Sequence, residues 1–293
     1  MDHRSSEWQL VFFTFLTQMA VGTFTFWGLP ALWIPTPNPF SEGNYPAVLL
    51  ALVLVFLALG TLSAGLHLGR LSHAIFAISN LKNSWLSREA LLGSSFGLVV
   101  LTLLIRRCFG ASFSVLDELF ILAGIIFGLT LVYGISRLYM LRTVPAWNNL
   151  GTPAAFFVTT FLSGTVVVIT LLFLLVSLGV DANIELDISR LFVFSTLLIL
   201  LFSAAQLCIF FFKVLYLQSQ GGAAADSIRI LWTNLRAILI WRFVLIFVGV
   251  GLLVFQLVIW LPSLFSLFAY GSILVSEILG RFLFYLFYQR EGF

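Results

Sequence analysis

The chain has 293 residues, of which 61% are hydrophobic and only 9% are charged, and its formal net charge is +3 at pH 7. A soluble domain carries about 25% charged residues, so this composition excludes a soluble globular protein, and the small, scattered charge does not suggest nucleic-acid binding. The long apolar runs do not alternate as the strands of a membrane barrel do. We therefore expect an all-α polytopic membrane protein.

Eight apolar runs are each close to the roughly 20 residues that a helix needs to cross the hydrocarbon layer. They cover residues 8–33, 46–66, 87–105, 115–140, 153–178, 190–216, 236–259 and 262–288. The N-terminus lacks the pattern of a signal peptide, so the first run is expected to be a retained helix. An even number of crossings places both termini on one side of a single membrane domain, residues 1–293.

Three connecting segments have their own character. Residues 71–81 carry apolar side chains at nearly helical spacing, which is compatible with a helix lying flat in the interface. Pro262 is expected to turn the chain between the last two runs. Residues 218–235 are predicted to form the longest irregular stretch, with flexibility at Gly221 and Gly222.

The distribution of lysine and arginine predicts an orientation, because these residues favour cytoplasmic loops. Ten of them fall on the side that carries both termini and three on the other side. The ten are Arg4, Arg70, Lys82, Arg88, Arg137, Arg142, Lys213, Arg229, Arg236 and Arg290, and the three are Arg106, Arg107 and Arg190. This bias predicts cytoplasmic termini. Alternatively, the positive loops serve to dock a partner, and the number of lysine and arginine residues then does not indicate the orientation.

The stretch from Ser63 to Ala90 gathers most of the polar chemistry, with His67 and Glu89 at the two helix ends that border it. Both helix ends lie on one side of the bilayer, so these two side chains can face one site. A quinone site needs an apolar cavity, a donor to a carbonyl oxygen and a group that passes protons. An imidazole and a partly dry carboxylate fit these roles. Arg70, one turn past His67, either holds a carbonyl oxygen or faces the interface.

A purely structural interpretation of the same pair is also open. In that interpretation His67 caps its helix, and Glu89 lies in the first turn of the next helix, where the helix dipole favours a carboxylate. The spacing of the two residues alone does not decide between this arrangement and a quinone site.

Histidine and cysteine counts limit the cofactors that this protein is able to hold. The three histidines are His3, His67 and His73, and the two cysteines are Cys108 and Cys208. A di-haem protein needs pairs of axial histidines on facing helices, which this set does not supply, so we expect no haem and no metal site. An ordinary iron–sulfur cluster needs four thiolates, so any such cluster must belong to another subunit.

Arg242 and Glu277 lie inside predicted membrane helices, roughly 9 Å and 16 Å from the helix ends at a 1.5 Å rise per residue. Both ends are on the positive side, so the two side chains can approach each other, and Arg281 is one turn from Glu277. Charges at such depth are usually paired or functional. A structural ion pair between the last two helices is the first interpretation, and a supporting role at the quinone site or a proton path is the second.

Several short motifs resemble, in order, the membrane anchor subunits of the dimethyl sulfoxide reductase family (DmsC-type). They are HLG at His67–Gly69, Asn80, LSxE at Leu86–Glu89, TVPxW at Thr143–Trp147, TPxxFF at Thr152–Phe157, WR at Trp241–Arg242 and ExxGRxxFY at Glu277–Tyr285. The set spans about the whole chain. The resemblance favours the quinone role for His67 and Glu89. It makes Trp147, otherwise an ordinary interfacial tryptophan, a candidate wall of the quinone pocket or a docking contact.

The resemblance implies a membrane anchor and quinone-reactive subunit of a three-subunit molybdopterin iron–sulfur oxidoreductase. It implies one partner with four iron–sulfur clusters and a second, catalytic partner with molybdopterin, which reduces a sulfoxide-type acceptor or oxidises sulfite. Electrons would pass between the clusters and menaquinone or ubiquinone in the cell inner membrane. The alternatives are a purely structural anchor and a secondary transporter, which would show internal repeats and broken helices.

Overall fold

The computed structural model describes residues 7–35, 38, 40–41, 43–68, 80–179, 188–259 and 265–288. These residues form nine α-helices and no strand. The helices are α1 (Glu7–Trp33), α2 (Tyr45–Leu68), α3 (Trp85–Cys108), α4 (Val115–Tyr139), α5 (Gly151–Ser177), α6 (Ile188–Gln220), α7 (Gly222–Thr233), α8 (Arg236–Ile259) and α9 (Phe265–Leu286). His3, Arg70, His73, the segment 71–79 and the turn at 260–262 lie outside the described residues.

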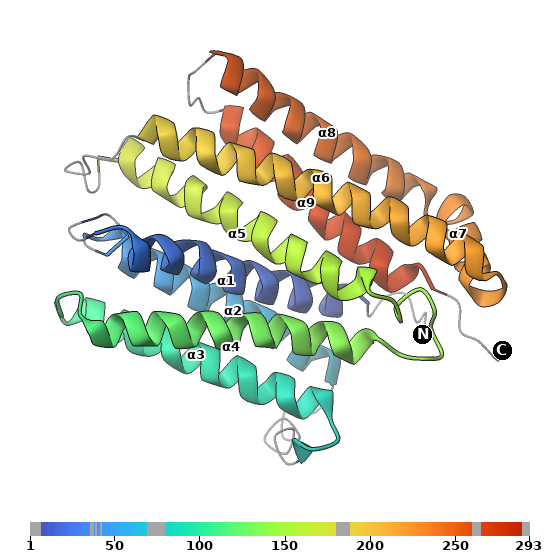
Figure 1. Cartoon of the computed structure of the whole chain (residues 1–293), viewed down its shortest axis with the longest axis horizontal. Helices are drawn as coiled ribbons and strands as arrows, with labels where there is room; N and C mark the ends of the chain where they lie inside the picture. The colour runs from blue at the N-terminus through green and yellow to red at the C-terminus, as the bar shows by residue number, and fades with distance from the viewer. Residues whose placement is uncertain are drawn as a thin grey trace.

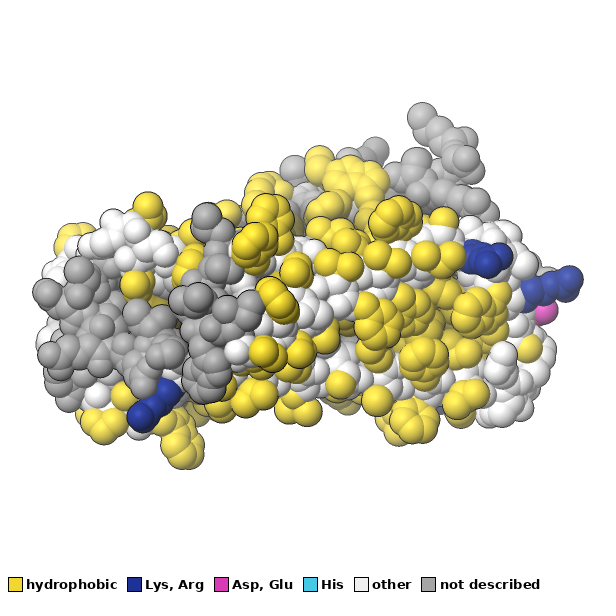
Figure 2. All heavy atoms as spheres, turned by 90° about the horizontal axis from the view of Figure 1, so that it is seen from above, with side chains coloured by type: hydrophobic (Ala, Val, Ile, Leu, Met, Phe, Trp, Pro, Cys, Tyr) yellow, Lys and Arg dark blue, Asp and Glu magenta, His cyan; other side chains and the backbone are white. Residues whose placement is uncertain are grey.

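Eight of the helices in the described residues are long and apolar enough to cross a membrane, which confirms the predicted all-α polytopic fold. They lie side by side along one axis, and α1 begins at the same end of the bundle at which α9 ends (Figure 1). Apolar side chains cover the middle of the face in Figure 2, and the visible Lys and Arg side chains lie toward its ends. Exposed apolar residues of this kind suit a hydrocarbon environment.

The prediction of an irregular segment at 218–235 was wrong. Gly221 and Gly222 form a turn with positive φ angles of 69° and 53°, and the helix α7 follows directly. Its buried residues Ala224, Ile228 and Leu231 recur at a spacing of three or four, which is the spacing of one helical face. The glycine pair therefore separates two helices and does not begin a loop.

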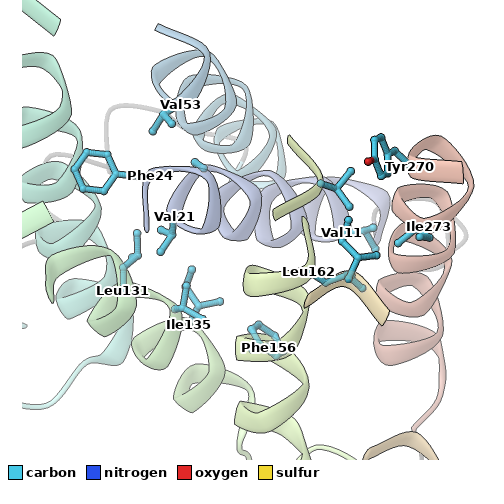
Figure 3. Packing of buried hydrophobic residues seen from close by; sticks show 14 of the residues in the cluster. Val11, Val21, Phe24, Val53, Leu131, Ile135, Phe156, Leu162, Tyr270 and Ile273 are labelled. Atoms are coloured by element: carbon cyan, nitrogen blue, oxygen red, sulfur yellow. The ribbon is translucent and has the colours of Figure 1, made fainter. Parts of the chain in front are cut away.

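Helix α1 is the centre of the bundle. Of its membrane-spanning window 72% is buried, against 22% for α6, and it contacts α2, α4, α5 and α9. Figure 3 shows side chains from these neighbours packed around α1. They include Val53 of α2, Leu131 and Ile135 of α4, Phe156 and Leu162 of α5, and Ile273 of α9.

The contact between α1 and α5 depends on two glycines. A Cβ atom at Gly22 would overlap the carbonyl oxygen of Thr160 and would lie 3.0 Å from the Cα of Gly164. Small residues let membrane helices approach this closely. Near the same crossing, the Gln18 side chain of α1 donates to the carbonyl oxygen of Phe156 at 2.8 Å. The two glycines therefore fix the register of α1 on α5.

Replacing Gly22 with alanine should destabilise the protein by about 1–3 kcal/mol, because the added methyl group forces the two backbones apart. Gly251 of α8 is a matched control, since a Cβ there meets nothing within 4 Å and alanine is the better helix former. Thermal unfolding of both variants in the same detergent measures the difference. Equal melting temperatures would show that the α1–α5 contact does not need glycine.

Candidate functional site

Most of the buried charged residues of the membrane helices gather at one end of the bundle. Helices α1, α3, α5 and α8 begin there, and α2, α4, α6 and α9 end there (Figure 1). His67 lies in the last turn of α2, with its side chain outside the described part of the structure. His67 and Glu89 therefore lie at the same end of the bundle as Arg242 and Glu277.

Glu89 is a buried carboxylate. It is the fifth residue of α3, which begins at Trp85 with Ser84 as its N-cap, so it lies beyond the first turn in which the sequence would place it. Glu89 is 8% exposed, and its Oε2 atom has no hydrogen-bond partner among the described residues. The hydroxyls of Tyr139 and Tyr285 are within electrostatic range of the Glu89 carboxylate. Since the helix dipole acts mainly on the exposed first turn, it does not by itself account for this buried acid.

An aromatic cluster lies beside Glu89 and contains the predicted residue Trp147. The ring of Trp147 stacks on Phe284 at 5.5 Å, and its Nε1 atom donates to the Phe284 carbonyl oxygen at 2.8 Å. Tyr139 lies edge-on to Trp147 at 6.0 Å and to Tyr285 at 5.2 Å. Trp147 is only 8% exposed, so it is packed inside the aromatic cluster and is not part of an exposed interfacial belt.

The turn after α4 positions this tryptophan. The backbone N–H of Trp147 donates to the Val144 carbonyl oxygen at 2.9 Å, and the Thr152 hydroxyl donates to the Trp147 carbonyl oxygen at 2.8 Å. The TVPxW motif thus lies in the connection between α4 and α5, and Thr152, the first residue of the TPxxFF motif in α5, fastens it. That connection holds the indole ring against α9.

A small cavity of about 60 Å³ lies on the other side of the aromatic cluster, between α5, α6, α8 and α9. Its polar lining residues are Thr159, Gln206, Lys213, Arg242, Glu277 and Arg281. A volume of this size holds roughly two water molecules. The cavity brings together the predicted residues Arg242 and Glu277, and it does not include Glu89 or Trp147.

Within this cavity, the expected ion pair between Arg242 and Glu277 is absent from the described structure. The Oε2 atom of Glu277 instead accepts from the Thr159 hydroxyl at 2.6 Å and from the Gln206 amide at 2.7 Å. Arg242 lies against Gly280, where a Cβ atom would be 2.9 Å from its Cζ atom. Because glycine leaves room there, the guanidinium packs on the α9 backbone without pairing with the carboxylate.

Helices α8 and α9 are joined in another way. The Ser276 hydroxyl of α9 donates to the backbone carbonyl oxygen of Arg242 at 3.0 Å. Arg281, which the sequence placed on the same helix face as Glu277, has its Cζ atom 3.8 Å from the ring centre of Phe156. The buried arginines Arg242 and Arg281 therefore contact aromatic rings and backbone, whereas Glu277 accepts from polar side chains.

The Glu89 region and the cavity share one wall. Phe284 stacks on Trp147 and also lines the cavity, and Tyr285 next to it donates to the Thr14 hydroxyl of α1 at 3.4 Å. Tyr139, Tyr285 and Lys213 were not among the residues predicted from the sequence. Tyr285 belongs to the ExxGRxxFY motif, and Lys213 is a charged residue inside an apolar run, so the sequence could have indicated both. Nothing in the sequence distinguished Tyr139.

Known proteins match this chain over much of its length. The sequence model of the family described as "DMSO reductase anchor subunit (DmsC)" matches residues 1–287. Anaerobic dimethyl sulfoxide reductase chain YnfH of Escherichia coli (strain K12) is 30% identical over 166 residues, which is 57% of this chain and 57% of that protein. The C subunit of anaerobic dimethyl sulfoxide reductase from the same strain is 30% identical over 181 residues, or 60% of each protein.

A third relative shows the same coverage. The C subunit of anaerobic dimethyl sulfoxide reductase from Haemophilus influenzae is 25% identical over 158 residues, 54% of this chain and 56% of that protein. The chain thus spans little more than half the length of the curated relatives that it matches. The family match covers nearly every residue, including each helix described above, and the chain belongs to the DMSO reductase anchor subunit (DmsC) family.

Proposed function

We propose that this protein anchors a molybdenum oxidoreductase in the membrane and exchanges electrons with a quinone beside Glu89. The observation that carries the proposal is the buried Glu89 carboxylate, which is 8% exposed and has an oxygen without a hydrogen-bond partner in the described structure. Burying an acid with an unpartnered oxygen costs folding free energy, so such a residue usually has a function. Membership of an anchor-subunit family supports the anchoring role.

The proposed site divides quinone chemistry among a few residues. Reduction of a quinone takes two electrons and two protons, so the site needs a donor to a carbonyl oxygen and a proton carrier. Glu89 is the proton carrier, and His67 at the end of the neighbouring α2 is the donor. Trp147 supplies an aromatic wall, and Arg70 is a second donor. Arg242 and Glu277 act from behind the aromatic cluster and do not touch the ring.

The electron route continues into partner subunits. An iron–sulfur subunit with four clusters docks at the end of the bundle that carries Glu89, and a molybdopterin subunit behind it reduces a sulfoxide-type acceptor or oxidises sulfite. The quinone is menaquinone or ubiquinone. The support is the family of anchor subunits and the names of the relatives, which are chains of dimethyl sulfoxide reductases.

The proposed orientation places this end of the bundle on the cytoplasmic side of the inner membrane. Lys82, Arg88, Arg142, Arg229 and Arg236 lie at or beyond the helix ends there. An excess of lysine and arginine favours the cytoplasmic side. A secondary transporter would instead show helices interrupted near the midplane, whereas the eight spanning helices of the described residues run without a break.

Replacing Glu89 with glutamine should slow quinone-linked turnover of the assembled complex by about 100-fold or more, because the amide keeps the shape but carries no proton. His67→Ala should act in the same direction. Turnover with an artificial dye that feeds the iron–sulfur subunit directly should stay unchanged in both variants. Glu118→Gln is the control, since Glu118 is an exposed acid at the opposite end of the bundle. If both site variants kept the wild-type rate of quinone-linked turnover, the proposed quinone site would be wrong and only the anchoring role would remain.

The orientation is tested with reporters fused after residue 293. A fluorescent protein that matures only in the cytoplasm should be bright, and an alkaline phosphatase that needs the periplasm should be inactive, because the positive end is retained inside. A second fusion in the α3–α4 connection, after Gly110, should give the opposite pair of results. Active phosphatase at the C-terminus would place the quinone end and the partner subunits outside.

A further inference from the structure

The cavity between α5, α6, α8 and α9 carries more positive than negative charge. Lys213, Arg242 and Arg281 line it, and Glu277 is the one acidic side chain among the described lining residues. Arg242 is 7% exposed and Arg281 is 4% exposed. Arginine stays protonated in proteins. Two guanidinium groups therefore face one carboxylate even where Lys213 is neutral.

None of these cations forms a direct ion pair within the described part of the chain, although Glu277 is within electrostatic range of both arginines. The ion pair recorded among the described residues joins Arg106 and Asp117, at the opposite end of the bundle. A terminal nitrogen of Arg281, Nη2, is buried and makes no hydrogen bond to the described residues. The three cations lie over aromatic rings, Arg242 over Phe210 at 5.4 Å, Lys213 over Phe284 at 5.2 Å and Arg281 over Phe156 at 3.8 Å.

Aromatic rings compensate only part of a buried charge. A cation–π contact contributes about 0.5–2 kcal/mol, whereas burying an ion costs several kcal/mol. Glu277 is the one carboxylate among the described lining residues: its Oε2 atom accepts from Thr159 and Gln206, its Oε1 atom has no hydrogen-bond partner among the described residues, and one negative charge does not balance two guanidinium groups. The cavity is therefore suited to a second, external anion.

The cavity lies just inside the headgroup layer of a bilayer, within reach of a lipid phosphate. Arg242 is the seventh residue of α8, and Arg281 lies five residues before the end of α9, which places both roughly 8–9 Å from the helix ends. The headgroup layer is about 5–8 Å thick on each side. Lys213 stands on α6 between Phe212 and Tyr216, which are 72% and 48% exposed and face the hydrocarbon. One edge of the cavity is thus next to lipid.

We propose that this cavity binds a phosphate-class anion, either the phosphodiester of an anionic phospholipid or free inorganic phosphate. Guanidinium groups donate in pairs to phosphate oxygens, which gives Arg281 and Arg242 their partners, and Lys213 adds a point charge. The bound anion joins α6, α8 and α9 at the end where the quinone site lies. The proposal does not depend on the quinone site, because none of its residues contacts the reacting ring.

The test uses the full-length protein and two probes. In nanodiscs of phosphatidylcholine with added phosphatidylglycerol, native mass spectrometry should show phosphatidylglycerol retained about tenfold or more over phosphatidylcholine, as expected for hydrogen bonds to a charged group. In detergent without lipid, phosphate should raise the melting temperature more than chloride at equal ionic strength. A response to the lipid alone identifies the headgroup, and a response to phosphate alone identifies the free ion.

Four variants of the cavity and its surroundings locate the effect. Arg281→Gln should weaken retention about tenfold, because it removes hydrogen bonds to the anion. Glu277→Gln should retain the anion as well as wild type or better, because it removes the competing negative charge. Arg229→Gln, an exposed cation of α7, should change nothing. Lys213→Gln should also weaken retention, and it replaces Arg281→Gln if that variant does not fold.

Two outcomes would overturn the proposal. One is equal retention of the two lipids together with equal effects of phosphate and chloride on the wild-type protein. The other is a loss of anion binding that is the same in Glu277→Gln as in Arg281→Gln, because a simple packing defect would produce it and a charge-selective site would not.

Discussion

The close contact of α1 with α5 determines where the polar side chains of α1 meet their partners on α5 and α9. In hydrocarbon, each polar group must find its partner inside the protein, so helix register and hydrogen bonding have to agree. Gly22 and Gly164 allow the approach, and Gln18 then reaches the carbonyl oxygen of Phe156. On the next face of α1, Thr14 accepts from Tyr285. One central helix thus places α5 and α9 relative to each other.

The two buried acids of this end have different surroundings, and the difference separates their roles. Two donors hold one oxygen of Glu277, and guanidinium groups line the same cavity. Each acid has one buried oxygen without a described partner, but the groups within electrostatic range of Glu89 are the tyrosine hydroxyls and not the guanidinium groups of the cavity. A carboxylate fixed by strong donors is suited to hold helices together. A carboxylate without them is suited to take up and release a proton.

Sequence patterns predicted the membrane fold because apolar runs longer than a bilayer is thick leave few alternatives. They also brought Arg242 and Glu277 to one place, since both helix ends had to lie on the positive side. They did not predict that Gly280 gives Arg242 space on the α9 backbone, nor that Thr159 and Gln206 take the carboxylate. Those choices depend on how the helices are rotated about their axes, which spacing along one helix does not determine.

The aromatic cluster explains how an acid and a group of cations coexist near each other without pairing. Phe156, Phe284 and Tyr285 pack between the Glu89 region and the cavity, and the Arg281 guanidinium lies on the face of Phe156. If Arg281 reached Glu89, a direct ion pair would hold that carboxylate in its charged form and remove it from proton transfer. The rings keep the two charges apart, so each remains available for the ligand proposed for it: a quinone on the α3 side, and an anion between α6, α8 and α9.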